Sequence, residues 1–284
     1  MAEHDREHDG TPRDAGVAQL RPGAARTDAG SVEIDAGEAR PRGIYLLPNL
    51  ITTGALFSGF FAIVAAMNGR YETGAIAIFV AGLLDTADGR VARLTRTESE
   101  FGAQYDSLSD LVAFGVAPAL VVFAWSLQSL GQLGWVAAFV YVACAALRLA
   151  RFNMHHDNAV FTGLASPAAA GILAFSVWAL TEATPTAPGP EGVGAFALAL
   201  LTLSVGLLMV APIEYWSPKQ INLRDRVPFI TLVLVVLGFA VVLVDPPRVL
   251  LAIAIVYAFS GPVLWLWRGR RGTGASSEGE PVRD

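Results

Sequence analysis

The sequence predicts an all-α protein, a polytopic transmembrane helix bundle with about eight spanning helices. Only 16% of its 284 residues are charged, whereas soluble domains contain about 25%. The mean hydropathy is +0.49. The apolar residues also form long runs, many of them close to the roughly 20 residues that cross a bilayer. These observations exclude an ordinary soluble domain, and the single cysteine, Cys144, excludes a disulfide within the chain.

Eight apolar segments are long enough to be predicted as spans. They are 44–67, 72–93, 107–127, 133–152, 163–182, 193–213, 228–244 and 248–267. Together they define an expected integral membrane domain, residues 43–268. The flanking segment 1–42 is rich in Gly, Ala, Asp and Arg, the segment 269–284 is rich in Gly and Arg, and both are poor in aromatic residues. That composition is typical of disordered tails.

The basic residues predict the orientation of these spans. If the N-terminus lies in the cytosol, all but two of the 20 Lys and Arg residues fall on the cytosolic side, and only Arg70 and Arg248 lie opposite. Lys and Arg are enriched in cytoplasmic loops of membrane proteins. We therefore expect both termini to be cytosolic, in a protein integral to the cell (plasma) membrane.

An acidic motif interrupts the apolar pattern at the cytosolic ends of the second and third segments. Asp85 and Asp88 are three residues apart, and Asp106 and Asp110 are four apart. On a helix each spacing places both carboxylates on one face. The short connection predicts antiparallel neighbours, so that four carboxylates converge. Their repulsion requires protons or cations, and an all-oxygen ligand set favours Mg²⁺ or Mn²⁺, plausibly as a pair of ions.

Small and basic residues accompany the acidic motif. Gly89, Ala92 and Gly102 leave room for a bulky anion to approach the backbone. Arg93, about one turn beyond Gly89, can bind a phosphate with its planar guanidinium. The set suits a pyrophosphate and displacement at phosphorus. Taken singly, the aspartates could equally be helix caps and the arginines topology anchors.

The motif resembles the signature of the CDP-alcohol phosphotransferase family. The pattern Asp-x2-Asp-Gly-x2-Ala-Arg-x8-Gly-x3-Asp-x3-Asp runs from Asp85 to Asp110 without departure. Residues 106–119, 148–153 and 161–171 are similar to the branch formed by the integral-membrane phosphatidylserine synthases, although Ala165 stands where a proline is common. The resemblance covers about residues 44–213, and 228–267 would be additional helices.

The resemblance implies roles for individual residues. Asp85, Asp88 and Asp106 would be metal ligands, and Asp110 would be the general base and a ligand of the second metal. The CDP-diacylglycerol head group would be held by Asn49, Thr52, Gly89, Arg93 and Ser99. For the segment around Asn49, the start of a helix is an equally good interpretation. Homodimers are typical of the family, so a homodimer is expected by analogy.

The reaction implied is transfer of the phosphatidyl group from CDP-diacylglycerol to L-serine, with release of CMP. Arg148, Arg151 and Asn153 lie at the cytosolic end of the fourth segment. An arginine there can bind the serine carboxylate with two hydrogen bonds. The alternative for both arginines is a role as positive-inside anchors.

Other functions remain open at the level of sequence. Within the family, the acceptor could be inositol phosphate, glycerol phosphate or choline. A cation- or proton-coupled transporter would also place carboxylates in a membrane, although here the acids gather at one cytosolic end. A non-catalytic membrane scaffold is a third class. The partners expected are the two substrates and membrane lipids, without nucleic acid.

Overall fold

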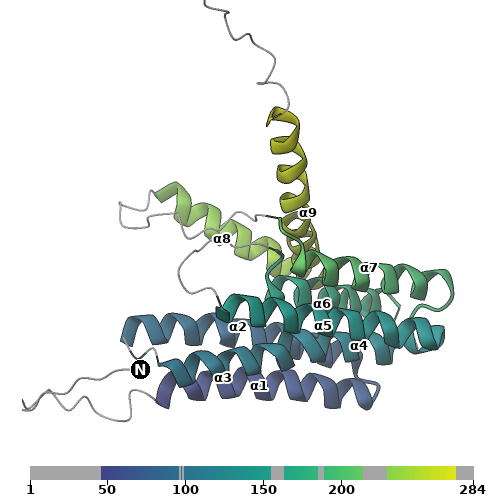
Figure 1. Ribbon diagram of the computed structural model, residues 1–284, viewed down its shortest axis with the longest axis horizontal. Helices are drawn as coiled ribbons and strands as arrows, with labels where there is room; N and C mark the ends of the chain where they lie inside the picture. Colours follow the sequence, from purple (N-terminus) through teal and green to yellow (C-terminus); the bar gives the residue numbers. More distant parts are fainter. Residues whose placement is uncertain are drawn as a thin grey trace, which may run out of the picture. The chain divides into compact units, whose positions relative to one another are not determined.

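Helices make up nearly all of the part of the chain that the structure describes (Figure 1). The computed structural model describes residues 46–95, 97, 99–154, 163–184, 189–213 and 229–272. Strands are absent from these residues, so the all-α prediction is confirmed there. The helices are α1 (Leu46–Met67), α2 (Tyr71–Thr95), α3 (Glu100–Asp110), η1 (Leu111–Val116), α4 (Ala117–Trp125), η2 (Leu127–Leu130), α5 (Gln132–Met154), α6 (Ser166–Ala183), α7 (Val193–Val210), α8 (Phe229–Val244) and α9 (Pro246–Gly272).

Each predicted segment corresponds to one helical segment, because α3, η1 and α4 follow one another without a break. The largest difference in position is at the third segment, which begins at Glu100 rather than at 107. Ser99 caps this helix, since its side chain accepts a hydrogen bond from the amide of Gly102. At the other end of the chain, α9 continues to Gly272. Residues 1–42 and 273–284 of the two expected tails lie outside the described residues.

Five helical segments of the described chain are long and apolar enough to cross a membrane. They are Leu47–Met67, Glu100–Trp125, Gln132–Met154, Val193–Val210 and Pro246–Leu264. The other three predicted spans correspond to α2, α6 and α8. Helix α2 carries the charged motif, and α8 has only 16 residues. The charges of α2 and the length of α8 therefore give these two helices a weaker signal than the other five segments have.

Small residues let the helices pack closely. Helix α1 packs along α2, α2 against α6, α5 along α7, and α6 against α9. Many fully buried positions are alanines, such as Ala62, Ala75, Ala81 and Ala113. At Gly59 the backbone of α1 closely approaches that of η1, because an added Cβ would lie 2.6 Å from the Cα of Ala113. Small residues at helix contacts are typical of membrane proteins, where backbones must approach to gain packing energy.

The helix that carries Asp110 changes its geometry directly after this residue. Segment η1 is a π-helix, in which the amide of Ala117 bonds the carbonyl of Val112, five residues earlier. The buried hydroxyl of Tyr141 on α5 donates to the carbonyl of Phe114 at 2.9 Å. That bond satisfies a buried main-chain acceptor within the irregular turn. Single π-turns are frequent at functional sites.

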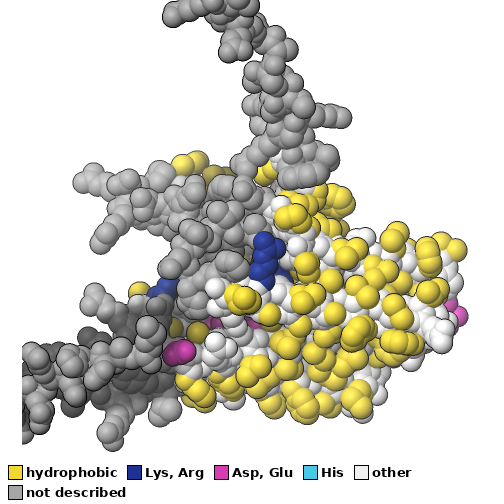
Figure 2. All heavy atoms as spheres, in the orientation of Figure 1, with side chains coloured by type: hydrophobic (Ala, Val, Ile, Leu, Met, Phe, Trp, Pro, Cys, Tyr) yellow, Lys and Arg dark blue, Asp and Glu magenta, His cyan; other side chains and the backbone are white. Residues whose placement is uncertain are grey.

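Hydrophobic side chains also cover much of the outer surface. On the face shown in Figure 2, they occupy most of the described surface, and charged side chains are few. Phe57, Phe60, Phe139 and Leu147 are each more than half exposed. An apolar surface this extensive is unfavourable in water and suits contact with lipid.

The close approach at Gly59 gives a prediction about stability. Gly59→Ala is expected to destabilise the protein by about 1–3 kcal/mol through overpacking, because the added methyl group meets backbone that cannot move freely. The matched control is Gly238→Ala on α8, where nothing lies within 4 Å of the added Cβ. Thermal unfolding in detergent is the measurement, with a lower Tm for the first variant only. Equal Tm values would contradict the helix contact.

Candidate active site

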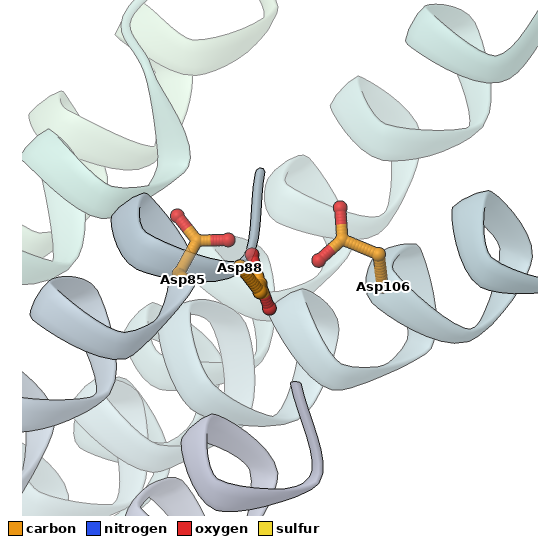
Figure 3. A group of neighbouring side chains, drawn as sticks. All are labelled: Asp85, Asp88 and Asp106. Atoms are coloured by element: carbon orange, nitrogen blue, oxygen red, sulfur yellow. The ribbon is translucent and has the colours of Figure 1, made fainter. Parts of the chain in front are cut away.

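Three carboxylates from two helices meet in one small volume. Asp85 and Asp88 lie one turn apart in the C-terminal part of α2, and Asp106 lies on α3. Each contributes one oxygen to a group whose members all lie within 4.8 Å of one another. Figure 3 shows the carboxyl groups of Asp85 and Asp106 directed toward each other, with Asp88 between them. The expected convergence of α2 and α3 therefore exists for these three residues.

The three carboxylates of Asp85, Asp88 and Asp106, called here the carboxylate cluster, are chemically suited to a divalent cation. Asp88 is buried, and Asp85 and Asp106 are partly buried. Like charges that are close together and shielded from water repel strongly unless a cation or a proton compensates them. All donor atoms are carboxylate oxygens, which hard ions such as Mg²⁺ and Mn²⁺ prefer. Asp85, Asp88 and Asp106 are thus able to hold a metal ion.

Asp110, the fourth aspartate of the motif, lies beside this group and is not one of its three members. Its carboxyl group lies within electrostatic range of that of Asp85. It is also within electrostatic range of Arg148 on α5. Asp110 therefore lies between the carboxylate cluster and Arg148 of α5.

Helix α1 supports the carboxylate cluster through Thr52. The hydroxyl of Thr52 donates to Oδ2 of Asp88 at 2.7 Å, and both residues are buried. Ser109 in turn donates to the main-chain carbonyl of Thr52 at 3.2 Å. Hydrogen bonds of this kind orient metal-binding carboxylates. Thr52 was expected to contact the nucleotide. In the structure its hydroxyl orients Asp88.

A cavity of about 250 Å³ opens next to the carboxylate cluster, between α1, α2 and α3. Asn49, Thr52, Gly89 and Ser99 line it, together with Asp88 and Asp106. Its volume is below the range of about 300–1,000 Å³ that encloses a drug-sized ligand. A head group fits this space better than an entire lipid.

Gly102 allows the wall of this cavity to be compact. A Cβ at this position would lie 3.1 Å from the hydroxyl oxygen of Ser99 and 3.4 Å from Oδ1 of Asn49. The Ser99 oxygen already accepts the amide of Gly102 at 3.0 Å, so its own hydrogen can still be donated. Asn49 and Ser99 therefore present polar groups to the cavity from two different helices.

Arg93 lies at the edge of the site. It is exposed, in the last turn of α2, and it is not among the residues that line the cavity. Its Nη2 lies 3.9 Å from the position that a Cβ on Gly89 would occupy. The guanidinium therefore folds back over Gly89, which does line the cavity.

The three residues expected at the acceptor have different surroundings at the end of α5. Arg148 is partly buried, and its Nη1 donates to the hydroxyl of Ser166 at 2.7 Å. Arg151 is exposed. Oδ1 of Asn153 accepts a hydrogen bond from Ser107 at 3.1 Å. Arg148 also has an electrostatic contact with Asp110.

The structure adds residues that the motif did not reveal. Pro48, Thr97 and Ala103 line the cavity, and Thr97 is buried and hydrogen-bonded to Thr95 at 2.7 Å. Tyr257 of α9 lies close enough to Arg148 for an electrostatic interaction. A hydroxyl residue in a loop carries no periodic signal, and Tyr257 is far from the motif in sequence. Neither Thr97 nor Tyr257 could have been found without the fold.

Comparisons with known proteins place this site in a family. The family model for CDP-alcohol phosphatidyltransferase matches residues 45–259. A CDP-diacylglycerol–serine O-phosphatidyltransferase of Helicobacter pylori is 32% identical over 79% of this chain and 92% of its own length. Proteins with the same name from Methanocaldococcus jannaschii and Mycobacterium tuberculosis are 31% and 37% identical, over 66% and 49% of this chain and 82% and 54% of their own lengths.

The family match includes the whole of the acidic motif, the residues that line the cavity and most of the described helices. The family match also extends into α9, well beyond residue 213, where the resemblance in the sequence was expected to end. The chain belongs to the CDP-alcohol phosphatidyltransferase family.

Proposed function

We propose that this protein transfers the phosphatidyl group from CDP-diacylglycerol to L-serine, forming phosphatidylserine and CMP. The observation that carries the proposal is the group of three carboxylates from α2 and α3 at the wall of a head-group-sized cavity. The names of the relatives from three distant organisms support serine as the acceptor. Residues 43–268 form the catalytic domain.

The nucleotide part of CDP-diacylglycerol occupies the cavity between α1, α2 and α3. Asn49 and Ser99 offer hydrogen-bonding groups there, and Gly89 lets the pyrophosphate approach the backbone. Arg93, which folds over Gly89, neutralises phosphate charge from the outer side. The acyl chains remain in the bilayer, so the lipid substrate and the lipid product need not leave the membrane.

The carboxylates hold the metal that the reaction requires. Asp85, Asp88 and Asp106 bind it, and Asp110 contributes to a second ion, both Mg²⁺ or Mn²⁺. Such ions, when bound, neutralise charge on the pyrophosphate. Thr52 keeps Asp88 in the orientation needed for binding.

Asp110 is the general base for the acceptor. It accepts the proton of the serine hydroxyl, whose oxygen forms a bond to the phosphorus that bears diacylglycerol. The bond from this phosphorus to the bridging oxygen breaks, and that oxygen leaves with CMP. Arg148, beside Asp110, binds the serine carboxylate and so directs the hydroxyl toward the base. Arg151 and Asn153 complete the acceptor side.

The membrane gives the site its surroundings. All eight helical segments cross the plasma membrane, both termini lie in the cytosol, and the active site faces the cytosol, as the distribution of Lys and Arg indicates. The protein acts as a homodimer, by analogy with its family, and does not bind nucleic acid. A transporter is less favoured, because the carboxylates adjoin a cavity lined by the signature residues.

The acceptor is tested directly with purified protein. CMP release from CDP-diacylglycerol is expected with L-serine and not with inositol phosphate, glycerol phosphate or choline. Asp110→Asn should lower the rate by about 10²–10⁴-fold, the usual contribution of a general base. Absence of CMP release with serine would reject this acceptor. Full activity of Asp110→Asn would reject the role of the base.

The metal site is tested by Asp88→Asn, which keeps the size of the side chain and removes its charge. Loss of a residue that only supports a metal ligand typically lowers metal affinity about 10–100-fold. Because Asp88 is itself a proposed ligand, the concentration of Mg²⁺ or Mn²⁺ needed for half-maximal activity should rise by more than this. Glu72→Gln is the matched control, because Glu72 is exposed in the first turn of the same helix. An unchanged metal requirement in Asp88→Asn would remove Asp88 from the ligands.

The role of Arg93 is tested by Arg93→Ala. Loss of a charged hydrogen bond to phosphate should raise the KM for CDP-diacylglycerol about tenfold and leave the KM for serine unchanged. Arg70→Ala, at an exposed position before α2, is the control. Steady-state kinetics in mixed micelles measure both constants. A selective rise in the KM for serine would instead assign Arg93 to the acceptor.

A further inference from the structure

Arg148 is held in place by a residue that usually has another function. Its Nη1 donates to the hydroxyl of Ser166 at 2.7 Å, and Ser166 is completely buried. Serine at the start of a helix commonly caps the main chain. In α6, however, Ala165 is at the N-cap position and no side chain caps the helix. The Ser166 hydroxyl is therefore used for Arg148 and not for the helix.

The guanidinium of Arg148 has one donor that the described residues leave unsatisfied. Its Nε is buried and has no hydrogen-bond partner among them. A buried N–H group without a partner is unfavourable, and such groups in native proteins call for an explanation. With Nη1 engaged by Ser166, the edge that carries Nε is the one that both oxygens of a carboxylate can bind.

Two further groups lie within electrostatic range of Arg148. One is Asp110, at the end of α3, and the other is Tyr257, on α9. Tyr257 is partly buried and packs against the hydrophobic core, and α9 packs along α6, the helix of Ser166. The guanidinium is thus hydrogen-bonded to Ser166, and Tyr257 and the proposed base lie within electrostatic range of the same cation.

We propose that Ser166 and Tyr257 are positioning residues that fix Arg148 as a carboxylate-binding group and so make the enzyme selective for an amino acid acceptor. The inference rests on the proposed function, in which Arg148 binds the acceptor. An alcohol without a carboxylate would leave the buried Nε unpaired. A site built to bond a substrate group rejects analogues that lack it far more strongly than an apolar pocket does. Helix α9 thereby becomes part of the acceptor site.

The test is a double-mutant cycle with steady-state kinetics in mixed micelles. Ser166→Ala and Tyr257→Phe each remove one hydroxyl and little volume. Ser166→Ala is expected to raise the KM for L-serine about tenfold, as for the loss of a hydrogen bond to a charged group. Tyr257→Phe removes a hydroxyl within electrostatic range of Arg148 and is expected to raise the same KM. The KM for CDP-diacylglycerol should not change. In an Arg148→Lys background, neither substitution should raise the KM for serine further, because each acts through Arg148.

Serinamide and a second serine on α6 provide the controls. Serinamide keeps the attacking hydroxyl but has a neutral amide in place of the carboxylate, so the variants should lower kcat/KM for serine and hardly change it for serinamide. The ratio of kcat/KM for serine to kcat/KM for serinamide is measured within one preparation, so it does not depend on the fraction of folded protein. Ser176→Ala is the matched control, because Ser176 is also buried on α6 but bonds only the carbonyl of Ile172 in its own helix.

The outcomes separate this inference from the proposed function. If the wild-type protein releases no CMP with serine, the proposed function fails. If the wild type uses serine and both variants keep its KM and its preference over serinamide, only the roles of Ser166 and Tyr257 are overturned. Effects that add to that of Arg148→Lys would also overturn them, since they would show action independent of Arg148.

Discussion

The mutual repulsion of carboxylates in a protein with a lipid-like surface is the constraint on which the rest of the structure depends. Asp85, Asp88 and Asp106 lie within a few ångströms of one another and are at least partly buried. Such an arrangement is stable only with compensating cations or protons and with helices that cannot separate. The hydrogen bond from Thr52 to Asp88 and the link from Ser109 to Thr52 join α1, α2 and α3 at this point.

The apolar bundle supplies the rigidity that the charged site needs. Gly59 brings α1 against Ala113, which lies three residues beyond Asp110 in the π-helical turn η1. Tyr141 satisfies a carbonyl of the same turn from α5. The segment that carries Asp110 is therefore fixed from two sides, although the helix geometry is irregular there. The small residues of the core serve the site as much as they serve the stability of the bundle.

The carboxylate cluster has two different sides. Asp88 and Asp106 line the cavity between α1, α2 and α3, whereas Asp85 lies close to Asp110, which is within electrostatic range of Arg148. In the proposed reaction the nucleotide-activated lipid binds on the first side and the acceptor on the second. Ions held by these carboxylates would neutralise charge that develops during transfer. This division explains why residues from six helices, α1, α2, α3, α5, α6 and α9, surround one small site.

The sequence by itself determined the helical class, the eight segments and the position of the acidic motif, because apolar run length and the spacing of charges on a helix are local properties. It also led to the correct family, since the motif lies within 26 consecutive positions. Only the tertiary structure decided that Asp110 lies beside the group of three and not within it, and that Thr52 bonds Asp88. It likewise decided that Ser166 bonds Arg148 and that Tyr257 lies within electrostatic range of it. These contacts join helices far apart in the chain, and no spacing rule specifies which side chains meet when such helices pack.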